Sequence, residues 1–134
     1  MKKSLLALLP FLTACAGEPP QNIGVRDFRL SPCPESPNCV SRFASGGEHS
    51  IAALEATLAQ IQRVVLALDE ANIVEQSSDY MYVEFTSRLM GYVDDVEFLY
   101  DSASNQTHVR SASRLGYSDL GANRKRIEAI RTQL

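Results

Sequence analysis

The sequence has 134 residues, of which 45% are hydrophobic and 22% charged, a composition typical of one globular domain. Its formal net charge is -3 at pH 7, so it lacks the basic excess of proteins that bind nucleic acid. It contains two histidines, His49 and His108, which leaves little material for imidazole chemistry. We therefore expect a single domain without a nucleic-acid partner.

The N-terminal residues have the features of a secretory signal peptide. Lys2 and Lys3 supply positive charge, and the apolar run at 4–12 is shorter than the roughly 20 residues that a transmembrane helix needs. The sequence LTAC at 12–15 resembles the bacterial lipobox, in which small residues precede a cysteine. In such lipoproteins the cysteine thiol takes a diacylglyceryl group, the chain is then cut just before the cysteine, and the new amine is acylated. This resemblance predicts a lipid-anchored Cys15. The alternative is a plain signal peptide with an incidental cysteine.

The lipobox interpretation divides the chain into three parts. Residues 1–14 are the signal peptide, residues 15–27 are the lipidated cysteine and a flexible tether rich in Pro and Gly, and residues 28–134 are the folded domain. Loss of Lys2 and Lys3 leaves 11 basic and 16 acidic side chains, a net charge of -5. In lipoproteins of this type, a residue other than Asp after the cysteine favours the outer membrane, and here Ala16 follows. We expect an outer-membrane lipoprotein that faces the periplasm.

Two further cysteines, Cys33 and Cys39, are separated by five residues, and prolines flank them and lie between them. The oxidising periplasm favours a disulfide, which would stabilise the fold by roughly 2–3 kcal/mol. A zinc site would need four ligands, and no second pair of ligands is nearby. A redox pair usually has the tighter CxxC spacing. The sequence therefore favours a structural disulfide.

Periodicity predicts a helix, four strands and a second helix, in that order. An apolar stripe at steps of three and four residues predicts a helix from Ser50, its N-cap, to Ala71. The second helix covers 122–133 and can be capped by Ser118 or Asp119. Alternating apolar residues predict strands at 73–77, 80–86, 95–100 and 107–112.

The last two strands are expected to form a hairpin around a turn at 102–105. This turn places Phe98 opposite Val109 and Glu97 opposite Arg110, and the opposite charges suit an antiparallel ladder. The fold class is therefore α+β: a four-stranded antiparallel meander with both helices packed on one face. The other face is expected to be more polar and partly solvated.

One motif occurs twice, each time where a strand is expected to end. SRLMGYVDD at 87–95 and SRLGYSD at 113–119 share Ser-Arg-Leu, then Gly-Tyr, then an acid. The segments SPNCVS at 36–41, GYVDDVEF at 91–98 and RSASRLGYSDLGANRKRIE at 110–128 closely resemble the DUF1499 family. The resemblance covers the chain from about Leu30 to the C-terminus. It implies a shared fold in bacterial envelope proteins and supplies no activity, because the family is of unknown function.

The repeated motif also supplies a candidate binding site. Arginine side chains are charged forks that suit carboxylate or phosphate, and free N–H groups at a helix start attract anions. Tyrosine hydroxyls can donate to the same ligand. The alternative is a structural network in which Arg88 pairs with Asp94 or Asp95, and Arg114 with Asp119. The candidate residues are Arg88, Tyr92, Asp94, Asp95, Arg114, Tyr117, Asp119, Asn123 and Arg124.

Metal binding and catalysis have weaker support in the sequence. The acids Asp94, Asp95, Glu97 and Asp119 could supply calcium ligands, but they lack EF-hand spacing, and adjacent Asp94 and Asp95 on a strand would face opposite ways. No Gly-x-Ser-x-Gly motif is present, so we expect no catalytic residue, metal or cofactor. The main hypothesis is a non-catalytic binding or structural lipoprotein whose partner is an envelope protein or an anionic small molecule. The alternative is an enzyme that acts on an anionic envelope substrate.

Overall fold

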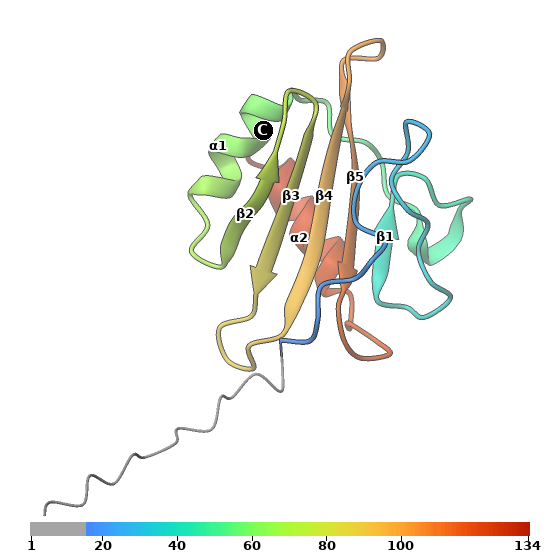
Figure 1. Ribbon diagram of the computed structural model, residues 1–134, viewed down its shortest axis with the longest axis vertical. Helices are drawn as coiled ribbons and strands as arrows, with labels where there is room; N and C mark the ends of the chain where they lie inside the picture. Colours follow the sequence, from blue (N-terminus) through green and yellow to red (C-terminus); the bar gives the residue numbers. More distant parts are fainter. Residues whose placement is uncertain (1–15) are drawn as a thin grey trace, which may run out of the picture.

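The computed structural model of the protein describes residues 16–134 and shows an α+β fold (Figure 1). Its sheet has five antiparallel strands rather than the predicted four, in the order β1-β5-β4-β3-β2. The strands are β1 (Cys39–Ser41), β2 (Ala71–Gln76), β3 (Tyr80–Thr86), β4 (Val93–Asp101) and β5 (Gln106–Ser113). The helices are α1 (Leu58–Leu66) and α2 (Ala122–Arg131), with a short 3-10 helix η1 (Gly47–His49).

The predicted start of the first helix is wrong. α1 begins after Thr57, which forms a capping box: the Thr57 hydroxyl accepts from the Gln60 N–H, and the Gln60 side chain accepts from the Thr57 N–H. The preceding residues instead run as a loop, in which Leu54 forms an isolated bridge with Thr107 of β5. Ile51 and Leu54 are buried there, so a buried loop produced the apolar spacing that predicted a helix. The helix also ends at Leu66, before the predicted Ala71.

The meander and its register are confirmed. Phe98 lies opposite Val109 and Glu97 opposite Arg110, with the β4–β5 turn at 102–105. The strand that the sequence did not predict, β1, pairs with the outer edge of β5, with Cys39 opposite Ala112. Three residues are too few to show a periodicity, which is why this edge strand was missed.

The predicted caps of the second helix, Ser118 and Asp119, are misplaced, because the N-cap of α2 is Gly121. Asp119 nevertheless binds the start of the helix. Its carboxylate accepts hydrogen bonds from the Gly121 and Asn123 N–H groups, at 2.8 and 3.1 Å. Gly121 itself adopts a left-handed conformation, with φ 82°, immediately before the helix. α2 then lies behind the sheet in Figure 1 and buries Ile127 and Ile130 against it.

The two faces of the sheet have different chemistry. On the helix face, α1 and α2 cover an apolar core that includes Met81, Phe85 and Phe98. The opposite face, which we call the outer face, carries acids, arginines and tyrosines at alternate strand positions, and is polar as predicted. However, its central residues are buried rather than solvated: Glu97 is 0% exposed and Asp95 is 1% exposed. The expectation of a partly solvated face is therefore wrong at its centre.

The N-terminal segment causes this burial. It crosses the outer face (Figure 1), and Leu30 packs there with Tyr80, Tyr82 and Leu99. The backbone N–H of Gly24 donates to Glu97 at 2.7 Å. Part of the segment predicted to be a tether, 15–27, thus has contacts with the sheet, and its flexibility stays a prediction. Within residues 16–134, no helix has the length and apolar character needed to cross a membrane.

Candidate functional site

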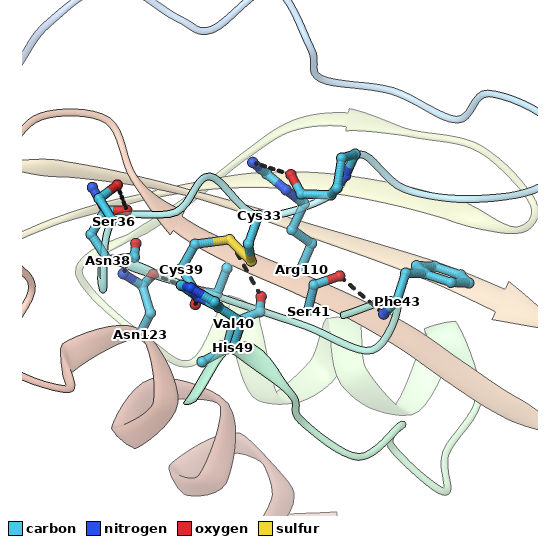
Figure 2. Close-up of a disulfide and its surroundings, with 12 residues drawn as sticks. Cys33, Ser36, Asn38, Cys39, Val40, Ser41, Phe43, His49, Arg110 and Asn123 are labelled. Atoms are coloured by element: carbon cyan, nitrogen blue, oxygen red, sulfur yellow. Dashed lines mark hydrogen bonds between the residues drawn. A yellow bond between two sulfur atoms is a disulfide. The ribbon is translucent and has the colours of Figure 1, made fainter. Parts of the chain in front are cut away.

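The predicted disulfide is confirmed. Cys33 and Cys39 are joined by an S–S bond of 2.06 Å at the start of β1 (Figure 2). Next to it, the Asn38 carbonyl accepts from the Ser113 N–H at 2.8 Å, and the Asn38 amide donates to the Gly116 carbonyl at 2.7 Å. The disulfide loop therefore fixes β1 to the end of β5 and to the second Gly-Tyr turn.

Arg114 of the second repeated motif forms a hydrogen-bonded cluster on the outer face. Its guanidinium binds Asp95 through two nitrogens, Nε at 3.1 Å and Nη2 at 2.6 Å, and Nη2 also contacts Glu84 at 2.8 Å. The Tyr82 hydroxyl donates to the same Asp95 carboxylate at 2.6 Å. Burial, with this hydrogen bond, raises the pKa of Tyr82, while the bond to Asp95 raises the pKa of Arg114. This arginine is thus paired internally and has little charge to offer a ligand.

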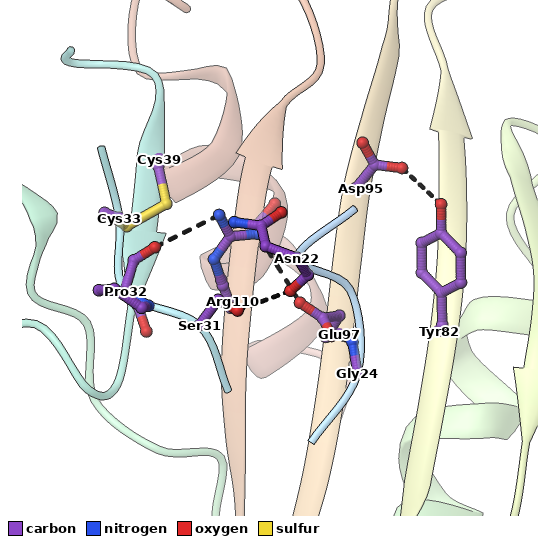
Figure 3. Close-up of polar contacts among 12 residues, drawn as sticks. Asn22, Gly24, Ser31, Pro32, Cys33, Cys39, Tyr82, Asp95, Glu97 and Arg110 are labelled. Carbon is purple, nitrogen blue, oxygen red and sulfur yellow. Dashed lines mark hydrogen bonds and ion pairs between the residues drawn. A yellow bond between two sulfur atoms is a disulfide. The ribbon is translucent and has the colours of Figure 1, made fainter. Parts of the chain in front are cut away.

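A second buried ion pair, Glu97 with Arg110, lies beside the first, but no hydrogen bond joins its two partners (Figure 3). Glu97 Oε1 accepts from the Gly24 N–H at 2.7 Å and from the Tyr80 hydroxyl at 2.8 Å. Its Oε2 is 3.7 Å from Arg110 Nη1, and neither atom has a hydrogen-bond partner in the described part of the chain. Burial raises the pKa of Glu97 and lowers that of Arg110. The pair therefore occupies the centre of the outer face without full hydrogen bonding.

A third cluster lies on the helix face. Asp94 pairs with Arg126 of α2 at 2.5 Å, and Arg126 also lies 4.9 Å from the ring centre of Phe85. Asn123 is buried and bonds the Asp119 carboxylate and the Ser111 hydroxyl. Asp94 and Asp95 face opposite ways, as the sequence predicts, so these neighbouring acids belong to different clusters.

The remaining candidate residues lie at other places on the surface. Arg88 pairs with Asp69 at 3.5 Å and Glu70 at 4.0 Å, rather than with Asp94 or Asp95. The alternative pairing of Arg114 with Asp119 is also wrong, because Arg114 binds Asp95 on the outer face and Asp119 accepts from N–H groups at the start of α2. Arg124 donates to backbone carbonyls at 48 and 50, and Tyr92 and Tyr117 are exposed. The nine candidate residues therefore do not converge on one pocket.

A cleft of about 410 Å³ lies between α2 and the end of β3. Its floor includes the apolar side chains of Leu68, Phe85 and Ile130. Its lining also includes three cations, Arg88, Lys125 and Arg126, and one acid, Glu70. Arg88 and Arg126 are paired with acids, whereas Lys125 has no ion-pair partner among residues 16–134. An apolar floor beside Lys125, the one cation of the lining without an acid partner in the described range, suits an anionic molecule that has an apolar part.

Sequence reasoning missed Tyr82, Glu84 and Arg126 as members of these clusters. For the first two a signal was present, since the alternation of β3 places Tyr80, Tyr82 and Glu84 on one face. No comparable signal marks Arg126, because its partner depends on how α2 crosses the sheet. No group of three or more metal-ligating side chains that could hold an ion occurs within the described range 16–134.

The comparisons with known proteins identify a family and no characterised relative. The sequence model of DUF1499, described as a protein of unknown function, matches residues 29–134. No curated protein and no solved structure matches the chain. The match includes both repeated motifs and the disulfide. The chain therefore belongs to the DUF1499 family, as its motifs predicted.

Proposed function

We propose that the protein is a lipid-anchored, non-catalytic binding module of the bacterial cell envelope, attached through Cys15 and facing the periplasm from the outer membrane. The lipobox-like LTAC sequence supports the anchor, and Ala16 after the cysteine supports the outer membrane. The disulfide between Cys33 and Cys39 supports an oxidising compartment, because such bonds are rare in the cytosol.

The single observation that carries the binding function is the cleft between α2 and β3. Its apolar floor and the cations of its lining favour an anionic envelope molecule with an acyl or other apolar part. The enzyme alternative has less support, because the arginines, acids and tyrosines expected to form its site lie in separate clusters. A catalytic site needs such groups within reach of one reacting atom.

The anchor predicts the mass of the mature protein. The protein purified from bacterial membranes should begin at Cys15, carry acyl chains there and lack residues 1–14. Intact-mass and N-terminal peptide mass spectrometry measure this directly. The matched control is Cys15→Ser, which should abolish the acyl mass. An unacylated wild-type protein that retains residues 1–14 would contradict the anchor.

The cleft predicts binding of an anionic amphiphile. Calorimetric titration with dodecyl phosphate, below its micelle-forming concentration, should show saturable binding. The double variant Arg88→Ala/Lys125→Ala should bind more weakly by roughly a hundredfold or more, because it removes two charge-assisted hydrogen bonds that are each worth about 1.5–3 kcal/mol. The control is Arg42→Ala, an exposed cation outside the cleft, which should bind like the wild type. Equal binding by all three proteins would remove the cleft as the site.

A further inference from the structure

Exposed apolar side chains are concentrated in two loops of the molecule. The loops are the β3–β4 loop at 87–92 and the β5–α2 loop at 114–121, which contain the two repeated motifs. Among residues 16–134, six of the eleven exposed large hydrophobic side chains lie in them. Leu89 is 93% exposed, Leu120 87% and Tyr117 76%. We call this set the apolar loop patch; its members are Leu89, Met90, Tyr92, Leu115, Tyr117 and Leu120.

Both loops lie at the same end of the sheet. β3 and β5 are both antiparallel to β4, which lies between them, so they run in the same direction and their C-terminal ends lie at the same end of the sheet. Figure 1 shows the two loops at the bottom of the molecule, on either side of the point where the described chain begins. The patch is therefore a local feature of one end rather than a set of scattered side chains, and such patches mark contact surfaces.

The start of the described chain is held against this end by two contacts. Arg114 Nη1 donates to the Gly17 carbonyl at 3.4 Å. The side chain of Leu115 packs so closely on Gly17 that an added Cβ there would lie 3.0 Å from Leu115 Cγ. Because an extended chain spans at most about 3.6 Å per residue, Cys15 is attached within roughly 7 Å of Gly17. Acyl chains on Cys15 would thus enter a bilayer beside the patch.

We infer that the apolar loop patch docks on the membrane that holds the lipid anchor. This inference rests on the proposed acylation of Cys15. The Leu and Met side chains would enter the boundary between headgroups and acyl chains, and Tyr92 and Tyr117 would lie at headgroup depth, where aromatic residues are enriched. A bilayer is the occupant that this end reaches when its own acyl chains are inserted. The Ser-Arg-Leu and Gly-Tyr repeats thereby gain a shared role: each projects a leucine and a tyrosine toward the same surface.

Single tryptophans test this orientation, because the natural chain contains none. The probes are Leu89→Trp and Leu120→Trp. The matched control is Phe28→Trp, because Phe28 is 92% exposed but lies away from the patch. Its neighbour Arg29 stacks on Phe43, which lies beside His108 near the start of β5, whereas the patch follows the end of β5. Each acylated mature variant, which begins at Cys15, is reconstituted in vesicles of phosphatidylethanolamine and phosphatidylglycerol that contain brominated phosphatidylcholine. Mass spectrometry of the same samples reports the acyl chains at Cys15.

With acyl chains present, Trp emission of the two patch variants should shift to shorter wavelength and be quenched several-fold more strongly by bromine than that of the control. Equal quenching of all three variants would overturn the docking and leave the anchor intact. A shift without quenching would also overturn it, because the patch would then be covered by protein. Absence of the acyl chains would instead remove the proposed anchor, and the docking with it.

A further variant, Leu120→Asn in the Leu89→Trp background, should lower the quenching if the two loops enter together.

Discussion

Replacing Arg114 by alanine is expected to lower the free energy of unfolding by about 3–5 kcal/mol, the usual cost of removing one partner of a buried ion pair. Asp95 is 1% exposed and receives two hydrogen bonds from Arg114, so the variant leaves a buried carboxylate with the Tyr82 hydroxyl alone. Urea unfolding of the wild type and the variant measures the difference. Arg114→Lys should fall between them, because an ammonium cannot reproduce the two-point contact.

The chain supplies a matched control in the other copy of the motif. Arg88 occupies the same place in Ser-Arg-Leu, but its side chain is 78% exposed and its pair with Asp69 is open to water. Such pairs contribute little to stability, so Arg88→Ala should unfold at nearly the same urea concentration as the wild type. Equal destabilisation by the two substitutions would show that the outer-face cluster does not hold Arg114 as described.

The fold was predictable wherever one face of a strand is apolar and the strand is long. β3, β4, β5 and the β4–β5 turn met this condition, and the register of Glu97 with Arg110 followed from the turn alone. β1 is three residues long and pairs at an edge, so no local pattern marks it. The start of α1 was missed for another reason. The capping box of Thr57 and Gln60 fixes it, whereas the apolar spacing before it reflects burial in a loop.

The candidate site was less predictable than the fold. The ion-pair partner of a charged side chain depends on the sheet face on which it lies and on the segment that covers it. Alternation correctly separated Asp94 from Asp95. It did not show that the N-terminal segment would bury Glu97, since that contact joins Gly24 to a residue far along the chain. The two copies of Ser-Arg-Leu are identical in sequence, yet the Arg114 side chain is 6% exposed and the Arg88 side chain is 78% exposed. Only the position of each loop relative to the outer face distinguishes them.

The Glu97–Arg110 pair leads to a prediction opposite to that for Arg114: replacing both partners should preserve most of the stability. In Glu97→Gln/Arg110→Leu, the glutamine carbonyl retains the hydrogen bonds from Gly24 and Tyr80, while the poorly bonded charges are removed. Because Oε2 and Nη1 lie 3.7 Å apart without other partners, their attraction offsets little of the cost of burying them. The double variant should therefore lie much closer to the wild type in its free energy of unfolding than Arg110→Leu alone.

Arg110→Leu alone should instead lower the free energy of unfolding by about 3–5 kcal/mol at pH 7, because Glu97 would be a buried carboxylate without its cation. Burial already raises the pKa of Glu97, and loss of Arg110 would raise it further. A carboxyl whose pKa is higher in the folded than in the unfolded state destabilises the fold as pH rises from the unfolded value through the folded one. The deficit of the single variant should thus shrink as the pH is lowered toward about 4, near the ordinary pKa of glutamate. Urea unfolding at several pH values checks this, with the double variant as the control that lacks the titrating group. A deficit in Arg110→Leu that stays constant with pH would assign the loss to packing instead of charge.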